Sequence, residues 1–533
     1  MNNKILYKMR FSLIVVVLLF VGCTKDLDVV PGDNNILLAD DFYSSSDAYR
    51  QGLAGVYSNL SLVGTNGPGE SNISGLDAGT SQYGRGLWNL QVLATDEAIW
   101  SYENDPGTAE IQRSTWAANN VLLRGLYGRA MASIAFANEF LRQTTNDLLD
   151  SRGVDETLKS DIAIYRAEAR FLRALSYYHL MDLFGKCAFL TEDDPVGGFQ
   201  APQIERLELF NFIESELLEI ASVMKEPRQN EYGRADRAAA WMLLAKIYLN
   251  AEVFIGTDKY ADCLVYCEKI IASPFELAQN YLDLFKADNN NNAAIPEIIF
   301  AIQSDGIITQ NWGPTTLMIN GQVGAQEGNG GDFGVNSGGW GGALRVPNRF
   351  SAIFMNGTYD TDSRNTLITA DRMIEIPSVE DRNTGYIVGK WSNLTSNGAN
   401  GAALDLVDTD FPMFRLADVY LMYAEASVRS NTSRAKGLEY FNLLRQRAGN
   451  PNLISESALT LDLLIDERLV ELYWESHRRQ DLIRFGKFTG NIYNWSWKGN
   501  SSVGGSIGAF RNVYPIPSES IAANPNLQQN IGY

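Results

Sequence analysis

Three glutamates recur at four-residue spacing near the C-terminal end of the 533-residue chain, among several arginines. Glu467, Glu471 and Glu475 would share one face of a helix, with Arg468 and Arg478 nearby. Two carboxylates on one face could serve as a general acid and a general base. A general acid needs a raised pKa, however, and neighbouring arginines lower it. Ion pairing within and between helices is therefore the favoured interpretation of this cluster.

Few other residues could carry chemistry. The chain has two histidines, and Cys263 and Cys267 lie four apart on a predicted helix without a His or third Cys near them in sequence. This pattern favours small buried helix residues over half of a metal site. Asp360 and Asp362 offer the oxygen ligands of a structural calcium ion, although a solvated turn fits them better. Since no nucleophile-elbow, phosphate-loop, dinucleotide or metalloprotease motif occurs, we expect no cofactor and no catalytic metal.

Composition excludes several classes of protein. The chain carries 44 Lys and Arg against 63 Asp and Glu, a formal charge of −19, which works against binding to nucleic acid. Hydrophobic residues make up 45% and charged residues 20%, as in folded globular proteins. Neither a nucleic-acid-binding protein nor a multi-pass membrane protein fits these values.

Residues 1–22 are typical of an export signal. A basic start precedes an apolar run of 11 residues, Phe11 to Val21, which is too short to span a bilayer. Val21-Gly22-Cys23 is similar to a bacterial lipobox, in which Cys23 becomes the lipid-modified first residue; Phe20 stands where that pattern prefers Leu. A plain secreted protein is the alternative. Residues 23–40 are polar and turn-rich and are predicted to be a lipidated tether.

Helical periodicity dominates residues 116–285 and 413–490. Within 161–184, a single apolar stripe runs through Ala167, Phe171, Ala174, Tyr178 and Met181. Other amphipathic stretches cover 206–222, 236–251, 258–272, 415–429, 435–448 and 460–476. Paired helices joined by short turns predict a scaffold of tetratricopeptide-like helical hairpins.

Residues 61–115 and 286–412 are rich in Gly, Asn, Ser and Thr and lack long apolar stripes. Such segments predict loops with short strands, and loops on a rigid scaffold usually carry the binding groups. We therefore expect a mainly α fold in one unit over residues 41–533. Its helical scaffold would carry a loop-rich ligand lobe.

Four C-terminal segments carry a family resemblance. They are Arg415-Leu-Ala-Asp418-Val-Tyr-Leu-Met-Tyr-Ala-Glu425-Ala, Asn442-Leu-Leu-Arg445-Gln-Arg-Ala-Gly449, the stretch from Glu467 to Gly486 with Arg478, Asp481 and Arg484, and the ending from Tyr514-Pro-Ile-Pro517 to Tyr533. Together they resemble the SusD/RagB family of outer-membrane nutrient-binding lipoproteins. The resemblance extends over nearly the whole chain from Cys23 onward and leaves no separate catalytic module, so it implies a binding protein without enzyme activity.

Several functional expectations follow from the resemblance. It implies a lipid-anchored protein on the outer face of the outer membrane that captures oligosaccharides and delivers them to a SusC-like TonB-dependent transporter for import. Three alternatives remain open: uptake of peptides, as in RagB-like members, a glycoside hydrolase with two catalytic carboxylates, and a helical scaffold that binds only protein.

SusD-like proteins hold a glycan against an arc of aromatic side chains, because the apolar faces of sugar rings stack on them while polar groups bind the hydroxyls. Aromatic residues of the loop-rich segments with polar neighbours meet this requirement. The predicted ligand-binding residues are Trp88, Asp96, Trp100, Tyr102, Asn311, Trp312 and Trp340. The alternative for each tryptophan is a buried anchor beneath a loop.

Overall fold

The computed structural model of the chain describes residues 39–324 and 328–533. It contains two compact units, residues 1–49 and residues 50–533. In the smaller unit the described part holds α2 (Ala39–Phe42) and the start of α3 (Ser46–Ser61). The predicted signal peptide, Cys23 and nearly all of the predicted tether lie outside the described residues.

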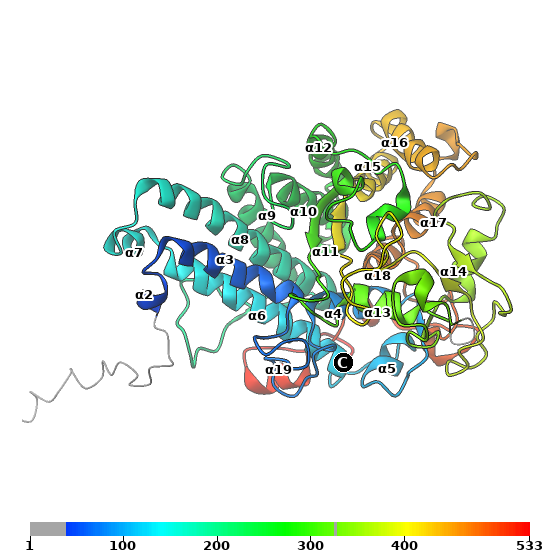
Figure 1. The fold of residues 1–533 in the computed structure, drawn as a ribbon, viewed down its shortest axis with the longest axis horizontal. Helices are drawn as coiled ribbons and strands as arrows, with labels where there is room; N and C mark the ends of the chain where they lie inside the picture. Colours follow the sequence, from blue (N-terminus) through cyan, green and yellow to red (C-terminus); the bar gives the residue numbers. More distant parts are fainter. Residues whose placement is uncertain (1–38, 325–327) are drawn as a thin grey trace, which may run out of the picture. The chain divides into compact units, whose positions relative to one another are not determined.

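Long helices dominate the larger unit (Figure 1). They are α6 (Val121–Gln143), α8 (Glu156–Phe184), α9 (Arg206–Ile220), α10 (Arg237–Leu249), α12 (Tyr260–Ile271), α15 (Leu416–Ser430), α16 (Arg434–Arg447) and α17 (Leu461–Leu472). Shorter ones are α4 (Tyr83–Trp88), α5 (Thr108–Gln112), α7 (Asn146–Ser151), α11 (Ala251–Ile255), α13 (Pro314–Gly321), α14 (Asn348–Phe354), α18 (Arg478–Arg484) and α19 (Ser518–Ala523).

The long helices pack in chain order. Helix α6 contacts α8, α8 contacts α9, α9 contacts α10, α10 contacts α12, α12 contacts α15, and α15 contacts both α16 and α17. This sequential packing of neighbours confirms the mainly helical, tetratricopeptide-like fold class. In the described residues, no helix combines the length and the apolar character needed to cross a membrane.

Helix α8 shows why the periodic segments fold as predicted. The Asp155 carboxylate caps its first turn by accepting a hydrogen bond from the N–H of Leu158 at 2.9 Å. Gly185 ends the helix with a φ of +74°, a conformation that a residue with a Cβ rarely adopts. The predicted stripe is at most 3% exposed at each of Ala167, Phe171, Ala174, Tyr178 and Met181.

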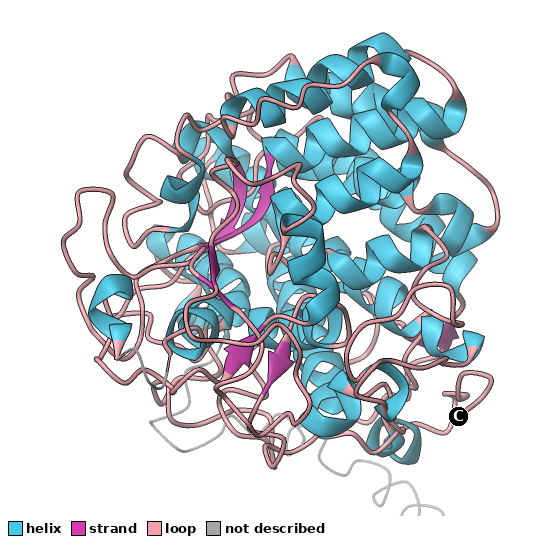
Figure 2. Cartoon of the chain, turned by 90° about the vertical axis from the view of Figure 1, so that its right-hand side faces the viewer, coloured by secondary structure: helices cyan, strands magenta, loops and turns pink. Residues whose placement is uncertain are grey.

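Short strands lie among the loops (Figure 2). The described residues form four two-stranded antiparallel sheets: β1 (Ile99–Trp100) with β5 (Leu344–Arg345), β2 (Cys187–Ala188) with β3 (Gln203–Ile204), β4 (Ile298–Ile302) with β8 (Phe411–Arg415), and β6 (Leu367–Ile368) with β7 (Ile387–Val388). Three of these sheets lie within, or at the edge of, the predicted loop-rich segments. The β1–β5 pair carries the candidate site.

The three regularly spaced glutamates do not share one helix as predicted. Helix α17 ends at Leu472, and Trp474 then adopts a φ of +64°, so Glu475 lies beyond the helix. All three glutamates are nevertheless ion-paired. Glu467 contacts Arg364 and Arg445, at 2.8 Å each. These contacts confirm the interpretation as ion pairs.

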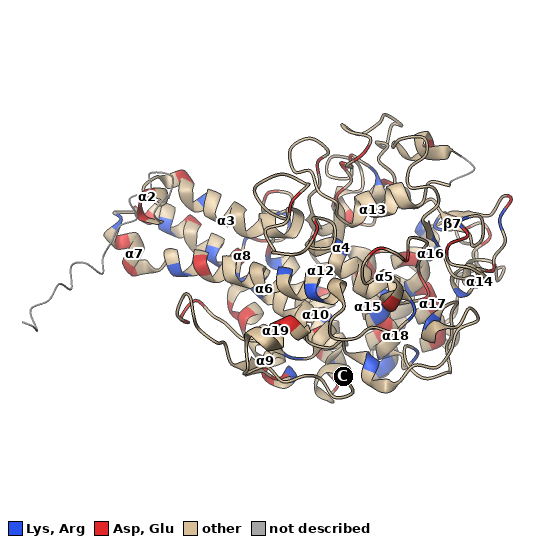
Figure 3. Ribbon diagram, turned by 90° about the horizontal axis from the view of Figure 1, so that it is seen from below, with Lys and Arg blue, Asp and Glu red and all other residues tan. Residues whose placement is uncertain are grey.

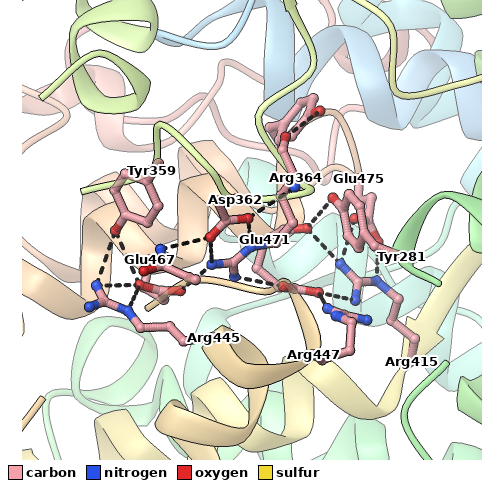
Figure 4. A network of polar contacts seen from close by, with 12 residues as sticks. Tyr281, Tyr359, Asp362, Arg364, Arg415, Arg445, Arg447, Glu467, Glu471 and Glu475 are labelled. Carbon is pink, nitrogen blue, oxygen red and sulfur yellow. Dashed lines mark hydrogen bonds and ion pairs between the residues drawn. The ribbon is translucent and has the colours of Figure 1, made fainter. Parts of the chain in front are cut away.

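The ion pairs belong to a larger buried network (Figure 4). Five cations, Lys390, Arg364, Arg415, Arg445 and Arg447, contact five carboxylates, Asp362, Glu297, Glu467, Glu471 and Glu475. None of these side chains is more than 5% exposed. Figure 3 shows further acidic and basic residues close together in α15, α17 and α18. The network is electrically balanced, which a buried cluster of charges requires.

Candidate ligand-binding site

Four of the predicted aromatic residues lie together. The ring centroids of Trp100 and Trp340 are 5.8 Å apart with the planes at 86°, and those of Trp312 and Trp340 are 6.3 Å apart at 31°. Tyr102 packs against Trp100 with a centroid distance of 5.8 Å. Trp312 and Trp340 are partly exposed, Tyr102 is 40% exposed and Trp100 is 5% exposed. The four residues form one aromatic cluster, with Trp100 as its innermost member.

Two short elements bring the cluster together. Trp100 is the last residue of β1 and pairs with Leu344 of β5, so the segment just before β5 runs beside it. That segment contains Trp340, whose N–H donates to the C=O of Asn320 in α13 at 2.9 Å. Trp312 lies two residues before the start of the same helix. Residues far apart in sequence therefore converge through one strand pair and one helix.

Glycines make this approach sterically feasible. Gly339 has a φ of +41°, and a Cβ there would lie 2.5 Å from the Cβ of Val323. A Cβ on Gly321 would lie 3.0 Å from the ring of Trp100. Side chains at these two positions would push Trp340 or Trp100 out of place.

Tyr102 has polar partners at the edge of the cluster. Its hydroxyl donates to the C=O of Trp340 at 3.2 Å and accepts from the Nη1 of Arg382 at 2.8 Å. The guanidinium of Arg382 also lies 5.4 Å from the centroid of the Tyr102 ring. The exposed rim therefore carries a cation that sequence reasoning missed, since Arg382 is 280 residues from Tyr102.

A pocket of about 250 Å³ adjoins the cluster at Trp100. Its wall includes Asp77, Arg85 and Asp105. The indole N–H of Trp100 donates to Asp105 at 2.9 Å, which fixes the orientation of the ring. The pocket thus places hydrogen-bonding groups directly beside an aromatic surface.

Arg85 is the most informative polar group of the pocket. In the described part of the chain its guanidinium makes no hydrogen bond or ion pair, and its Nε is buried without a partner. Burial lowers the pKa of Arg85, and the nearby Asp77 and Asp105 oppose the shift without cancelling it. A half-buried cation with unused N–H donors is suited to bind the hydroxyl groups of a ligand. The sequence does not indicate this role of Arg85, because in its segment only Trp88 fits the pattern of a ligand-binding aromatic residue.

Three predicted ligand residues are buried, and of these only Trp88 lines the pocket beside Trp100. Trp88 is 1% exposed and packs edge-on against Trp474 at 6.5 Å, because α4 continues into a buried π-helical turn, Asn89–Leu93. Asp96 is fully buried and accepts two hydrogen bonds from Arg478, each at 2.7 Å. Asp96 is thus held in an ion pair with Arg478, whereas Trp88 forms part of the wall of the pocket.

Asn311 is the third. It is 4% exposed, and its side-chain oxygen accepts from the N–H of Gly313 at 2.8 Å while its amide donates to the C=O of Thr309 at 3.1 Å. It shapes the turn before α13 that carries Trp312. Its role is to position the aromatic residue next to it.

The calcium hypothesis at residues 360–362 also loses support. Asp362 is buried and accepts hydrogen bonds from Arg364 at 2.9 and 2.6 Å and from Asn450 at 2.9 Å. Within the described ranges, no group of three or more His, Cys, Asp or Glu is placed to hold a metal ion.

Comparisons with known proteins agree on one family. Residues 357–533 match the model of the SusD family. The starch-binding protein SusD of Bacteroides thetaiotaomicron is 33% identical over 577 aligned residues, which cover 99% of each chain. Among solved structures, a SusD superfamily protein from Bacteroides thetaiotaomicron has a TM-score of 0.70 at 17% identity, with 91% of this chain and 99% of that one covered.

Surface glycan-binding protein A from Bacteroides thetaiotaomicron, solved in complex with laminarihexaose, has a TM-score of 0.66 at 21% identity. The match covers 91% of this chain and 99% of that one. At these identities the two structures support the fold.

Proposed function

Because the chain belongs to the SusD family, we propose that it is a binding protein that captures oligosaccharides for nutrient uptake. The observation that carries this proposal is the convergence of Trp100, Trp312 and Trp340 beside a polar pocket. Sugar rings stack on such aromatic faces, and the free donors of Arg85 can bind their hydroxyls. One similar protein is a starch-binding protein and another was solved in complex with laminarihexaose, so oligosaccharides of glucose are the first ligands to test.

Anchoring and delivery extend the proposal. Residues 1–22 serve as the signal peptide and Cys23 as the lipid attachment site, with 23–40 as tether and 41–533 as one working unit on the outer face of the outer membrane. A SusC-like TonB-dependent transporter receives the captured glycan. The lipobox-like sequence and the family support this arrangement. Labelling of cells with radioactive palmitate should mark the protein and fail for Cys23→Ser, and the transporter should co-purify with it.

Glycan cleavage is disfavoured by the electrostatics of the pocket. Asp77 and Asp105 both line it, and a glycosidase needs a carboxyl pair of which one is a general acid with a raised pKa. Burial would raise the pKa of Asp77, but hydrogen bonds from Thr80 and the charge of Arg85 outweigh it and lower the pKa. Release of new reducing ends from a bound glycan, lost in Asp77→Asn, would contradict the proposal.

Isothermal titration of the soluble Cys23→Ser protein with maltoheptaose and laminarihexaose tests glycan binding. Trp340→Ala should weaken binding at least tenfold, about 1.4 kcal/mol, because it removes a stacking face. Trp241→Ala is the matched control, since Trp241 is a partly exposed tryptophan of α10 outside the cluster. Equal affinity of Trp340→Ala and wild type would refute the site. If oligopeptides bind and no glycan does, the peptide-uptake alternative replaces the proposal.

A further inference from the structure

A second pocket, of about 630 Å³, lies in the larger unit. Its wall comes from α3, from residues 231–234, from β4 and the loop after it, and from Asp410. None of the seven predicted ligand residues lines it. The pocket and the aromatic cluster thus have no lining residue in common, although Asn311 hydrogen-bonds to Ser304 in the pocket wall at 3.3 Å.

Asp410 is a buried acid in this wall with unused hydrogen-bonding capacity. The residue is 0% exposed, and its Oδ1 accepts from the N–H of Ser304 at 2.7 Å. Its Oδ2 has no partner among the described residues. The hydroxyl of Tyr232, also in the wall, has no hydrogen-bond partner among the described residues. It lies close to the Asp410 carboxyl, because burial first and then the charge of Asp410 raise the pKa of Tyr232. An unmet buried acceptor needs an explanation, and a ligand would supply one.

The arginines of the pocket wall do not neutralise its two aspartates. Its two arginines, Arg50 and Arg234, already pair with glutamates at 2.7 and 2.5 Å. Asp305 and Asp410 form no ion pair in the described part of the chain, and Asp305 accepts from the backbone N–H groups of its own turn. The unmet charge that a ligand would see is therefore negative.

Most of the remaining wall is apolar. Leu53 and Tyr57 contribute from α3, Phe300 and Ile302 from β4, and Ile308 lies in the following loop at 83% exposure. The hydroxyl of Tyr57 is already used, since it donates to Glu168 at 2.6 Å. A ligand of this pocket thus needs an apolar body and one charged donor.

We propose that this pocket binds an organic ammonium ion, whose nitrogen donates to Asp410 and whose apolar part packs against Leu53 and Phe300. The Tyr232 hydroxyl lies beside the same carboxyl and accepts a second N–H of the ligand. The ammonium ion supplies the positive charge that the wall lacks. This binding activity goes beyond glycan capture and does not depend on it.

Affinity for the ammonium ion should depend on pH. Burial, with smaller contributions from Asp408 and Asp305, raises the pKa of Asp410 to about 7, although the hydrogen bond from the N–H of Ser304 and the neighbouring hydroxyl of Tyr232 oppose the shift. Below that pH the carboxyl is neutral and attracts a cation weakly. Binding should therefore tighten as pH rises from about 6 to about 8. The other charged groups of the wall, besides Asp305, are Arg50, Arg234 and Glu231, and each of these three forms an ion pair.

Two ligands of equal shape test the proposal on the Cys23→Ser protein by isothermal titration at pH 8. Phenethylamine carries the ammonium ion, and 2-phenylethanol carries a hydroxyl on the same apolar body. Phenethylamine should bind at least tenfold more tightly than the alcohol. Asp410→Asn should remove that preference, and its amide oxygen can still accept from Ser304. Tyr232→Phe should weaken amine binding about threefold.

Controls separate this proposal from glycan capture. Trp340→Ala should leave amine binding unchanged, and Asp410→Asn should leave glycan binding and the thermal midpoint unchanged. The proposal is overturned if the amine and the alcohol bind equally, if neither binds, or if Asp410→Asn binds the amine as wild type does. Should Asp410→Asn fail to fold, the amine-to-alcohol ratio and its pH dependence in wild type decide instead.

Discussion

Replacing Arg415 by Met removes one cation from the balanced network of five cations and five carboxylates. The guanidinium of Arg415 donates five hydrogen bonds, to Glu297, to the carboxylate and the C=O of Glu471, and twice to Glu475. The residue is 1% exposed, so water cannot replace these bonds. Methionine has an unbranched side chain that can occupy much of the same space.

The expected cost follows from the charge that remains. The network keeps four cations against five carboxylates, and breaking a buried ion pair from one side costs about 3–5 kcal/mol. Burial would raise the pKa of Glu471, but Arg447, Arg415 and Arg364 outweigh it and hold the pKa well below its ordinary value. Such a depressed pKa stabilises the fold above the unfolded value of about 4.3 and loses that effect as pH falls. The loss in Arg415→Met should therefore be larger at pH 7, above the unfolded pKa, than at pH 3, below it.

Urea denaturation at both pH values measures this free energy of unfolding. Arg50→Met is the matched control, because Arg50 pairs with Glu231 while the two side chains are 62% and 52% exposed. Arg50→Met should lower the free energy of unfolding by less than about 1 kcal/mol. The double variant Arg415→Met/Glu475→Gln restores the charge balance. Its loss of free energy of unfolding should be smaller than the sum of the losses in the two single variants. Equal costs for Arg415→Met and Arg50→Met, or a cost independent of pH, would refute the reasoning.

Three further substitutions test the pocket and its support. Burial raises the pKa of Glu97 to about 8, so ionisation of this carboxyl is unfavourable in the folded state. Wild type should therefore lose stability relative to Glu97→Gln as pH rises from about 5 to about 8, which urea titrations at both pH values would measure. Gly339→Ala should cost about 1–3 kcal/mol and weaken glycan binding, because a Cβ there meets Val323; wild-type affinity in calorimetry would contradict this. Arg85→Met should lower glycan affinity about tenfold without lowering the thermal midpoint, since the guanidinium has no hydrogen-bond partner among residues 39–324 and 328–533. A large drop in that midpoint would show a structural role instead.

The helices could be predicted because their signals are local. The stripe of α8 and the capping residue Asp155 lie within the segment that they organise. The end of α17 could not be predicted, because the chain turns at Trp474 with a positive φ that the spacing of the glutamates does not indicate. A four-residue period continues past the point at which the backbone leaves the helix.

The site was partly predictable for a similar reason. Trp100, Trp312 and Trp340 each have polar or glycine neighbours, and the structure brings them together. Trp88 has a comparable preceding segment, but Leu90 and Val92 after it are fully buried and pull the segment inward. The sequence around Asp96 does not indicate that this residue is buried, because its partner Arg478 lies 382 residues further along the chain. Tertiary pairing of this kind leaves no local pattern.

The same pairing has a consequence for how the binding site forms. Asp96 and Glu97 stand just before β1, which carries Trp100, and they are held by Arg478 and by the N–H groups of Trp474. The strand therefore acquires its anchor only after nearly nine-tenths of the chain is present. Closing loops of 377 and 382 residues is entropically costly and slow. A chain cut before Trp474 would keep Trp100, Trp312 and Trp340 and still lack the groups that hold the start of β1, so we expect such a truncated chain to lose glycan binding.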